Sequence, residues 1–244
     1  GVTTWAGLIK SVRAKVKGTK VKIRLGASSG EWKAMVADEA ARTTFAKNIK
    51  TVLEKNKLDG IDLDFEWAEN EKEYKDYSLA ILKMREVLGN KYLFSVSLHP
   101  VCYQISKEAI EAVDFISLQC YGPSPVRFPI EKYCSDIQMV LEYGIPKEKL
   151  VAGVPFYGVT KDNSKKTEAY FNFVQNGLVT SPAQNEVIYQ GDTYVFDGQD
   201  NIRIKTRYAK EQKLKGMMSW DLATDLPLSD SRSLLKTMTE ELRE

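Results

Sequence analysis

The segment from Asp59 to Trp67 reads DGIDLDFEW and alternates acidic with apolar residues. In a β-strand, successive side chains point to opposite faces, so the acids share one face and the apolar residues share the other. Successive acids on that face lie about 7 Å apart, and away from bulk water they cannot all ionise freely. We therefore expect at least one to hold a proton near neutral pH. A protonated carboxyl beside an ionised one is the arrangement that glycosidic bond cleavage requires. The three acids are Asp62, Asp64 and Glu66.

The alternative interpretation of this segment is an edge strand whose acidic face is merely solvated. Trp67 and the hydrophobic strands that follow favour a strand covered on both sides.

The composition is that of an ordinary globular protein with 244 residues, of which 43% are hydrophobic and 28% charged. The net charge of +2 and the scattered lysines argue against a nucleic-acid partner. The chain has no apolar run of about 18 residues, which predicts no membrane span. The spacing of Cys102, Cys120 and Cys134 fits neither a disulfide framework nor a zinc site, so buried free thiols are expected. His99 is the only histidine, and we expect a hydrogen-bonded rim residue, no metal and no cofactor.

Apolar segments alternate with amphipathic ones along the chain, which predicts βαβ units and a parallel sheet. Polar and aromatic residues recur where the predicted strands end, as in the active sites of (β/α)₈ barrels. A doubly wound sheet would place its site at a switch point instead, but neither G-x-G-x-x-G nor a P-loop follows any strand. The barrel is therefore favoured. The predicted strands cover residues 20–28, 59–67, 92–100, 113–122, 149–158 and 216–220, and the predicted helices 37–57, 71–88, 130–143 and 231–242.

The motifs resemble those of glycoside hydrolase family 18, the chitinases and endo-β-N-acetylglucosaminidases. DGIDLDFEW fits the D-x-x-D-x-D-x-E signature through Asp59, Asp62, Asp64 and Glu66. LVAGVPFYG and GMMSWDLATD look like the family's seventh and eighth barrel strands, and the segment between them resembles the family's approach to the last strand. The resemblance covers roughly residues 5 to 242 and implies a single catalytic domain over residues 1–244.

Two motifs depart from the family pattern. Residues 24–27 (RLGA) stand where S-x-G-G is usual, a change that we attribute to packing. Residues 119–122 (QCYG) stand where M-x-Y-D is usual, so Tyr121 matches while Gly122 replaces an acidic residue that helps to hold the substrate's acetamido group.

With this alignment, the first recognisable strand is the third of the barrel. Residues 1–18 supply a helix-like stretch but no earlier strand pair. A six-stranded remnant would leave open edges. We therefore expect a (β/α)₈ TIM barrel whose first two strands are absent from the chain as given; the alternative is an atypical barrel.

The resemblance implies a retaining, substrate-assisted glycoside hydrolase. Glu66 would be the general acid and later the base, and the carbonyl oxygen of the substrate's 2-acetamido group would be the nucleophile. Asp64 would orient the acetamido N–H, and Asp62 would share a proton or hydrogen bond with Asp64. Tyr121 would donate its hydroxyl to the acetamido oxygen. Asp59 is expected to bond the backbone beneath the site.

Aromatic and amide side chains are the candidates for sugar binding. Trp220 resembles the tryptophan that floors the sugar subsite, since a flat ring suits the apolar face of a pyranose. Tyr157, Trp67 and Gln119 are further candidates, each with core packing as the alternative. Trp32 is a further candidate for the cleft wall, again with core packing as the alternative.

The implied partner is an N-acetylglucosamine-containing oligo- or polysaccharide, either a chitin-type β-1,4 polymer or the chitobiose core of an N-glycan. Peptidoglycan fits less well. The apparent absence of a large α+β insertion between Gly158 and Asp200 suggests an open cleft and internal cleavage, with a possible hairpin at 186–196 and a loop at 161–166. We expect a monomer that is secreted, periplasmic or at the cell surface, as the substrate class implies, although no signal peptide is seen in the sequence.

Two competing hypotheses remain. An inactive sugar-binding lectin on the same barrel is kept open by Gly122, whereas the presence of Glu66 favours an enzyme. An unrelated parallel-sheet enzyme would need another catalytic set, and the sequence shows no Ser/His/Asp arrangement at motif spacing.

Overall fold

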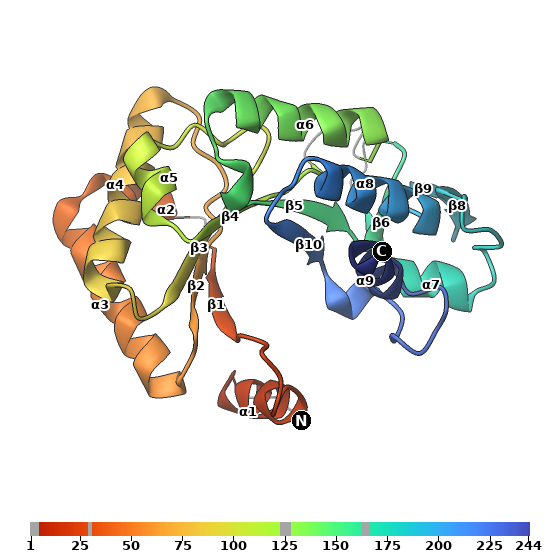
Figure 1. Cartoon of the computed structure of the whole chain (residues 1–244), viewed down its shortest axis with the longest axis horizontal. Coiled ribbons are helices and arrows are strands. Elements are labelled where there is room, and N and C mark those ends of the chain that lie inside the picture. Colours follow the sequence, from red (N-terminus) through yellow and green to blue (C-terminus); the bar gives the residue numbers. More distant parts are fainter. Residues whose placement is uncertain (1–4, 29–30, 123–127, 163–165) are drawn as a thin grey trace. The chain divides into compact units, whose positions relative to one another are not determined.

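The computed structural model describes residues 5–28, 31–122, 128–162 and 166–244, and it divides into two compact units (Figure 1). The first unit runs to Leu98 and includes Gln104–Ile116; the second comprises His99–Tyr103 and Ser117–Glu244. A six-stranded sheet has the order β1-β2-β3-β4-β5-β10, and β1–β2, β2–β3 and β5–β10 are parallel. The prediction of six strands of a (β/α)₈ barrel is confirmed.

In the first unit, helices α2 to α5 cover one side of the strands (Figure 1). The strands here are β1 (Arg24–Ala27), β2 (Gly60–Leu63), β3 (Leu93–Leu98) and β4 (Phe115–Leu118), the last of which continues into the second unit. The helices are α1 (Trp5–Lys15), α2 (Trp32–Ala37), α3 (Glu39–Asn56), α4 (Glu71–Leu88) and α5 (Lys107–Ala112).

The long helices begin at residues whose side chains cap them. The Asp38 carboxylate accepts the Ala41 N–H at 2.7 Å at the start of α3, and Asn70 accepts the Glu73 N–H at 3.0 Å at the start of α4. Such caps satisfy backbone donors that have no partner within the helix. Helix α3 ends where Lys57 adopts the left-handed conformation, with φ of 52°.

Strand β2 lies between β1 and β3, so the edge-strand alternative is wrong. Ile61, Leu63 and Phe65 are buried on the face of the sheet that the helices cover, as the alternation of acidic and apolar residues predicts. Gly60 is required because a Cβ there would lie 1.9 Å from the carbonyl oxygen of Leu93. Close contact between β2 and β3 thus depends on a residue without a side chain.

The second unit contains the remaining strands of the sheet, its helices and a small antiparallel sheet. Its helical elements are α6 (Ile130–Tyr143), η1 (Lys147–Lys149), α7 (Tyr170–Gln175), α8 (Gln199–Glu211), η2 (Leu222–Thr224) and α9 (Leu234–Arg243). Its strands are β5 (Leu150–Pro155), β6 (Tyr157–Thr160), β7 (Thr167–Ala169), β8 (Glu186–Tyr189), β9 (Asp192–Val195) and β10 (Gly216–Trp220).

The interval after Gly158 holds more structure than the sequence predicts. Strands β7, β6, β9 and β8 form a four-stranded antiparallel sheet, and helix α7 accompanies it. The hairpin predicted at 186–196 is confirmed as β8 and β9, whereas β7 and α7 were not predicted. The predicted loop at 161–166 falls partly outside the described residues. The open cleft and the internal cleavage stay predictions.

A buried ion pair joins α8 to the core of the second unit. The Nζ of Lys205 donates to Asp197 Oδ2 at 2.6 Å and to the carbonyl oxygen of Phe128 at 2.8 Å. Both charged side chains are almost wholly buried. Burying such a pair requires each partner to be satisfied, so the loss of one partner should be costly. Among the described residues, no helix is both long and apolar enough to cross a membrane.

Candidate active site

The three acids occupy the end of β2 and the segment that follows it. Asp62 lies within the strand, whereas Asp64 and Glu66 come directly after it. The Asp64 N–H still donates to the carbonyl oxygen of Ala27 at 2.9 Å, which extends the pairing with β1. Asp62 and Asp64 are half-buried and Glu66 is exposed. The predicted face is thus formed, with Glu66 as its most accessible carboxyl.

The backbone of Glu66 is held from the helix side. Trp32 at the start of α2 is buried and donates its indole N–H to the Glu66 carbonyl oxygen at 3.1 Å. Its ring stacks on Phe65 with centroids 5.3 Å apart. The cleft-wall interpretation of Trp32 is therefore wrong, because the side chain belongs to the core. Trp67 follows Glu66 through a cis peptide bond and is half-buried.

The innermost acid, Asp62, is surrounded by hydrogen-bond donors. Ser97 on β3 donates its hydroxyl to Asp62 Oδ2 at 2.7 Å, and Ser95 donates to Oδ1. Arg24 Nη1 lies 3.9 Å from Oδ1 and donates to the Ser95 hydroxyl oxygen. Arg24, Ser95 and Ser97 were not predicted from the sequence as neighbours of the acidic face. The alternation in LFSVSL was a usable signal, since it points both serines to one face of β3.

Asp59 lies below this face. Its Oδ2 accepts the main-chain N–H of Ile23 at 2.8 Å, and Lys22 lies 3.8 Å from Oδ1. The prediction that Asp59 bonds the backbone is confirmed.

In the second unit, Tyr121 and Tyr157 come together in an aromatic cluster. Their ring centroids are 6.3 Å apart and edge-on, and Phe128 packs on Tyr157 at 6.0 Å. The Tyr121 side chain is buried, with its hydroxyl 3.9 Å from the sulfur of Met218. Gln119 follows β4 and is also buried. Tyr157 and Met218 are partly buried and pack against this cluster, and Met218 was not predicted as a site neighbour.

Trp220 is the last residue of β10. Its side chain is 55% exposed, whereas Tyr121 and Gln119 are buried. The core alternative for this side chain is therefore wrong. Its neighbour Asp221 caps the following turn by accepting the Ala223 N–H at 2.7 Å. A large exposed ring on a fixed strand end can receive the apolar face of a sugar.

His99 and Gly122 lie next to each other in the second unit. His99 is buried, and its Nδ1 accepts the Val101 N–H at 3.4 Å. A Cβ on Gly122 would lie 3.4 Å from His99 Nε2, an ordinary contact distance. Gly122 is thus not a steric requirement of the fold.

The cysteines are free, as expected, and Cys102 and Cys120 are buried while Cys134 is half-buried. Burial raises the pKa of the Cys120 thiol to about 12. Within the described residues, no group of three or more His, Cys, Asp and Glu side chains could hold a metal ion.

Comparison with known proteins identifies the class to which this fold and these motifs belong. The family model "Glycosyl hydrolases family 18" matches residues 6–225, so the chain belongs to this family. The chain is 23% identical to "Probable chitinase 2" of Drosophila melanogaster over 84% of its own length and 56% of the relative. The chain spans about half the length of this relative and of "Chitinase A1" of Niallia circulans.

Two solved structures show the same fold. A chitinase from Bacteroides thetaiotaomicron superposes with a TM-score of 0.86 at 21% identity, over 99% of this chain and 82% of the other. The chitinase-like agglutinin of Robinia pseudoacacia superposes with a TM-score of 0.80 at 19% identity, over 97% and 84%. Proteins described as a chitinase and as an agglutinin thus share this fold, and the fold alone does not distinguish catalysis from binding.

Proposed function

We propose that this chain carries the catalytic residues of a retaining glycoside hydrolase that cleaves β-1,4 linkages of N-acetylglucosamine-containing glycans. The observation that supports this most is Glu66, an exposed carboxyl at the end of an inner strand. Its main chain is fixed by Trp32. A general acid needs access to the glycosidic oxygen and a fixed position, and Glu66 has both features.

Each further residue has a role in the proposed reaction. Glu66 protonates the leaving oxygen while the carbonyl oxygen of the 2-acetamido group attacks the anomeric carbon and closes an oxazolinium ion. Asp64 orients the acetamido N–H and stabilises the developing positive charge. Tyr121 donates its hydroxyl to the acetamido oxygen, which requires that it leave the sulfur of Met218. Glu66 then takes a proton from water, which opens the oxazolinium ion with net retention.

Substrate binding is assigned to the aromatic side chains near the strand ends. Trp220 provides the floor under one sugar, since it is the exposed ring at the end of β10. Tyr157 is half-buried and provides a side wall, with Gln119 and Trp67 as polar and aromatic contacts. No cofactor takes part in this scheme. A monomer acting outside the cytoplasm on chitin-type oligomers or the N-glycan core remains the expected setting.

Product stereochemistry tests the mechanism directly. Proton NMR during hydrolysis of chitotetraose should show the β-anomer first, and a thiazoline analogue of the oxazolinium ion should inhibit competitively. An α-anomer as the first product would contradict the proposal, because it requires direct attack by water.

The competing function is sugar binding without cleavage, which Gly122 favours because it replaces the acidic residue of the M-x-Y-D motif. The variant Gly122→Asp separates the two functions, since position 122 has room for a side chain. For an enzyme, both forms cleave chitotetraose and the variant alters KM. For a lectin, both forms bind the sugar and neither one cleaves it.

A further inference from the structure

The main chain at Trp220 is held by the neighbouring strand, while the side chain is exposed. Trp220 lies opposite Pro155 in the parallel β5–β10 ladder, and its carbonyl oxygen accepts the Phe156 N–H at 2.8 Å. The indole ring itself is 55% exposed. Such a ring binds a sugar well only if little conformational freedom is lost on binding. The direction of the ring therefore depends on the course of the chain that follows it.

The chain after Trp220 closes into a short turn over residues 221–224. The Asp221 carboxylate accepts the Ala223 N–H at 2.7 Å. Thr224 donates its hydroxyl to the Asp221 carbonyl oxygen at 2.8 Å and accepts the Asp221 N–H at 3.4 Å. These reciprocal bonds form a capping box and make the turn a unit of its own. Its residues are exposed or half-buried, so a further attachment is needed to fix its position.

Asp225 follows this turn and is the first buried residue after Trp220. Its Oδ1 accepts the Leu234 N–H at 3.0 Å. Its Oδ2 accepts the Leu235 N–H at 2.8 Å and the Ser233 hydroxyl at 2.9 Å. The three donors lie at the start of α9, where the helix dipole favours a negative charge. Hydrogen bonds to a charged acceptor are stronger than those between neutral groups, so Asp225 joins the turn to this helix.

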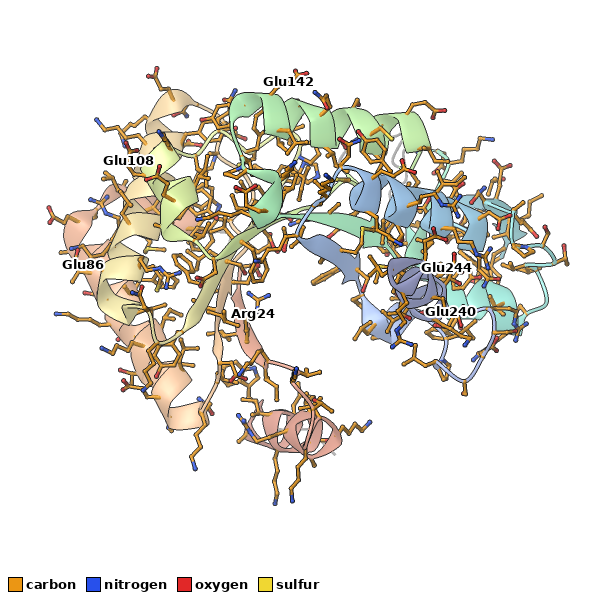
Figure 2. All side chains as sticks on the ribbon, in the orientation of Figure 1. Arg24, Glu86, Glu108, Glu142, Glu240 and Glu244 are labelled. Atoms are coloured by element: carbon orange, nitrogen blue, oxygen red, sulfur yellow. The ribbon has the colours of Figure 1, made fainter. Side chains whose placement is uncertain are left out.

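Helix α9 is itself attached to the rest of the second unit. It packs along α8, and four of its residues are buried, namely Leu234, Thr237, Met238 and Glu241. The Gln199 amide on α8 donates to the Thr237 hydroxyl oxygen at 2.9 Å. Figure 2 shows Glu240 and Glu244 at the end of α9 opposite to the end that Asp225 binds. The start of the helix is thus a fixed point to which the chain after β10 is attached.

We propose that Asp225 is a positioning residue for substrate binding, because it attaches the turn after β10 to α9 and thereby fixes the ring of Trp220. The proposal rests on the proposed hydrolase function, in which Trp220 is the floor under one sugar, and deepens it. Asp225 does not contact the sugar. Without this attachment, the turn at 221–224 is free to move and the ring takes more than one direction. Binding then has to order the ring, which weakens the affinity.

The first test is a double-mutant cycle in which calorimetry measures the Kd for chitotetraose. Asp225→Asn keeps the size of the side chain but removes its charge and one acceptor oxygen. We expect the Kd to rise about tenfold in Asp225→Asn, and not to change further when Asp225→Asn is added to Trp220→Ala. Equal losses in both backgrounds would overturn the proposal, because Asp225 would then act independently of Trp220. An unchanged Kd in folded Asp225→Asn would overturn it as well.

Further variants separate this effect from a general loss of stability. Asp230→Asn is the matched control, since Asp230 lies on the same connection to α9 but pairs with Arg232 at 2.7 Å. Ile202→Val removes one wholly buried methyl group of α8 and weakens the same unit. Both should bind chitotetraose with the wild-type Kd, and a rise as large as in Asp225→Asn would overturn the proposal. Ser233→Ala removes only one donor to Asp225, so its Kd should rise by a smaller factor.

A second readout needs no substrate. The chain has four tryptophans, so the protein labelled with 5-fluorotryptophan gives four ¹⁹F NMR resonances, and Trp220→Phe identifies the one from Trp220. We expect this resonance to shift or broaden in Asp225→Asn, while those of Trp32 and Trp67 stay in place. An unmoved Trp220 resonance would overturn the proposal even if the hydrolase assignment holds. If the resonance moves but the wild type binds no chitotetraose, the sugar-floor role of Trp220 fails and its positioning by Asp225 stands.

Discussion

The indole N–H of Trp32 and the main-chain carbonyl of Glu66 form a hydrogen bond of 3.1 Å. Trp32 belongs to helix α2, and Glu66 follows strand β2. The bond links the core between the helices and the sheet to the residue that we propose as the general acid. Since Trp32 also stacks on Phe65, the position of Glu66 depends on packing that lies outside the substrate site.

The first prediction concerns this bond. Trp32→Phe keeps an aromatic ring on Phe65 but removes the donor to Glu66. One such hydrogen bond contributes about 1 kcal/mol, so kcat should fall about three- to tenfold with little change in KM. Tyr77→Phe is the control, because Tyr77 packs on the same rings but donates to the carbonyl of Leu63 at 3.4 Å. Equal losses of kcat in both variants would show that the effect comes from core packing alone.

A second prediction separates binding from folding at Trp220. The side chain is 55% exposed, so Trp220→Ala should leave the urea midpoint nearly unchanged. Loss of an aromatic binding surface costs about 2 kcal/mol, or roughly 30-fold in the Kd for chitotetraose. The matched control is Trp5→Ala, since Trp5 is 50% exposed on α1. If both variants bind like the wild type in calorimetry, Trp220 is not the sugar floor.

The third prediction concerns the stability of the second unit. Lys205→Met leaves the Asp197 carboxylate buried without its cation, which should lower the free energy of unfolding by about 3–5 kcal/mol. The double variant with Asp197→Asn should recover part of this loss. Lys236→Met, which breaks an exposed pair with Glu240, should cost less than about 0.5 kcal/mol. Urea denaturation of the three variants measures these differences, and similar costs for Lys205→Met and Lys236→Met would contradict the account of the buried pair.

A fourth prediction follows from the thiols. Because burial raises the pKa of Cys120 to about 12, its reactive thiolate is scarce at any lower pH. Iodoacetamide at about pH 8 should therefore modify the half-buried Cys134 before Cys120 in the folded protein. Both should react in urea, where the pKa of each returns toward about 8.5. Mass spectrometry of tryptic peptides measures the order in which the two thiols are alkylated. Faster modification of Cys120 would contradict the prediction and show that its environment opens.

The sequence predicted the sheet well because its signals were local and periodic. Helices α4 and α6 and strand β10 have the predicted bounds, since their apolar residues repeat at helical spacing or form a short run before a turn. Helix α8 was not predicted as such, although its motif was recognised. The short α7 was also missed, because six residues are too few to show a clear period.

The candidate site was predicted only where it follows a motif. Glu66, Asp64 and Asp62 come from one signature. The prediction that they lie on the opposite face from the intervening apolar residues is confirmed, because those apolar residues are buried and the acids are not. Arg24 and Ser95 could not be derived in this way, since their relation to Asp62 depends on the register of three strands that are distant in sequence. Trp32 was misjudged for a similar reason, because only the tertiary structure distinguishes a buried tryptophan from a cleft wall.

The central claim, that Glu66 is the general acid of a glycoside hydrolase, is tested most directly by one measurement. Hydrolysis of fluorogenic chitobiose and chitotriose glycosides is compared between the wild type and Glu66→Gln, with sugar binding checked by calorimetry in both. The account predicts that the wild type cleaves these glycosides, whereas the variant binds with a similar Kd and loses at least about a hundredfold in kcat. Cleavage by the variant at the wild-type rate, or binding by both without cleavage by either, would contradict it.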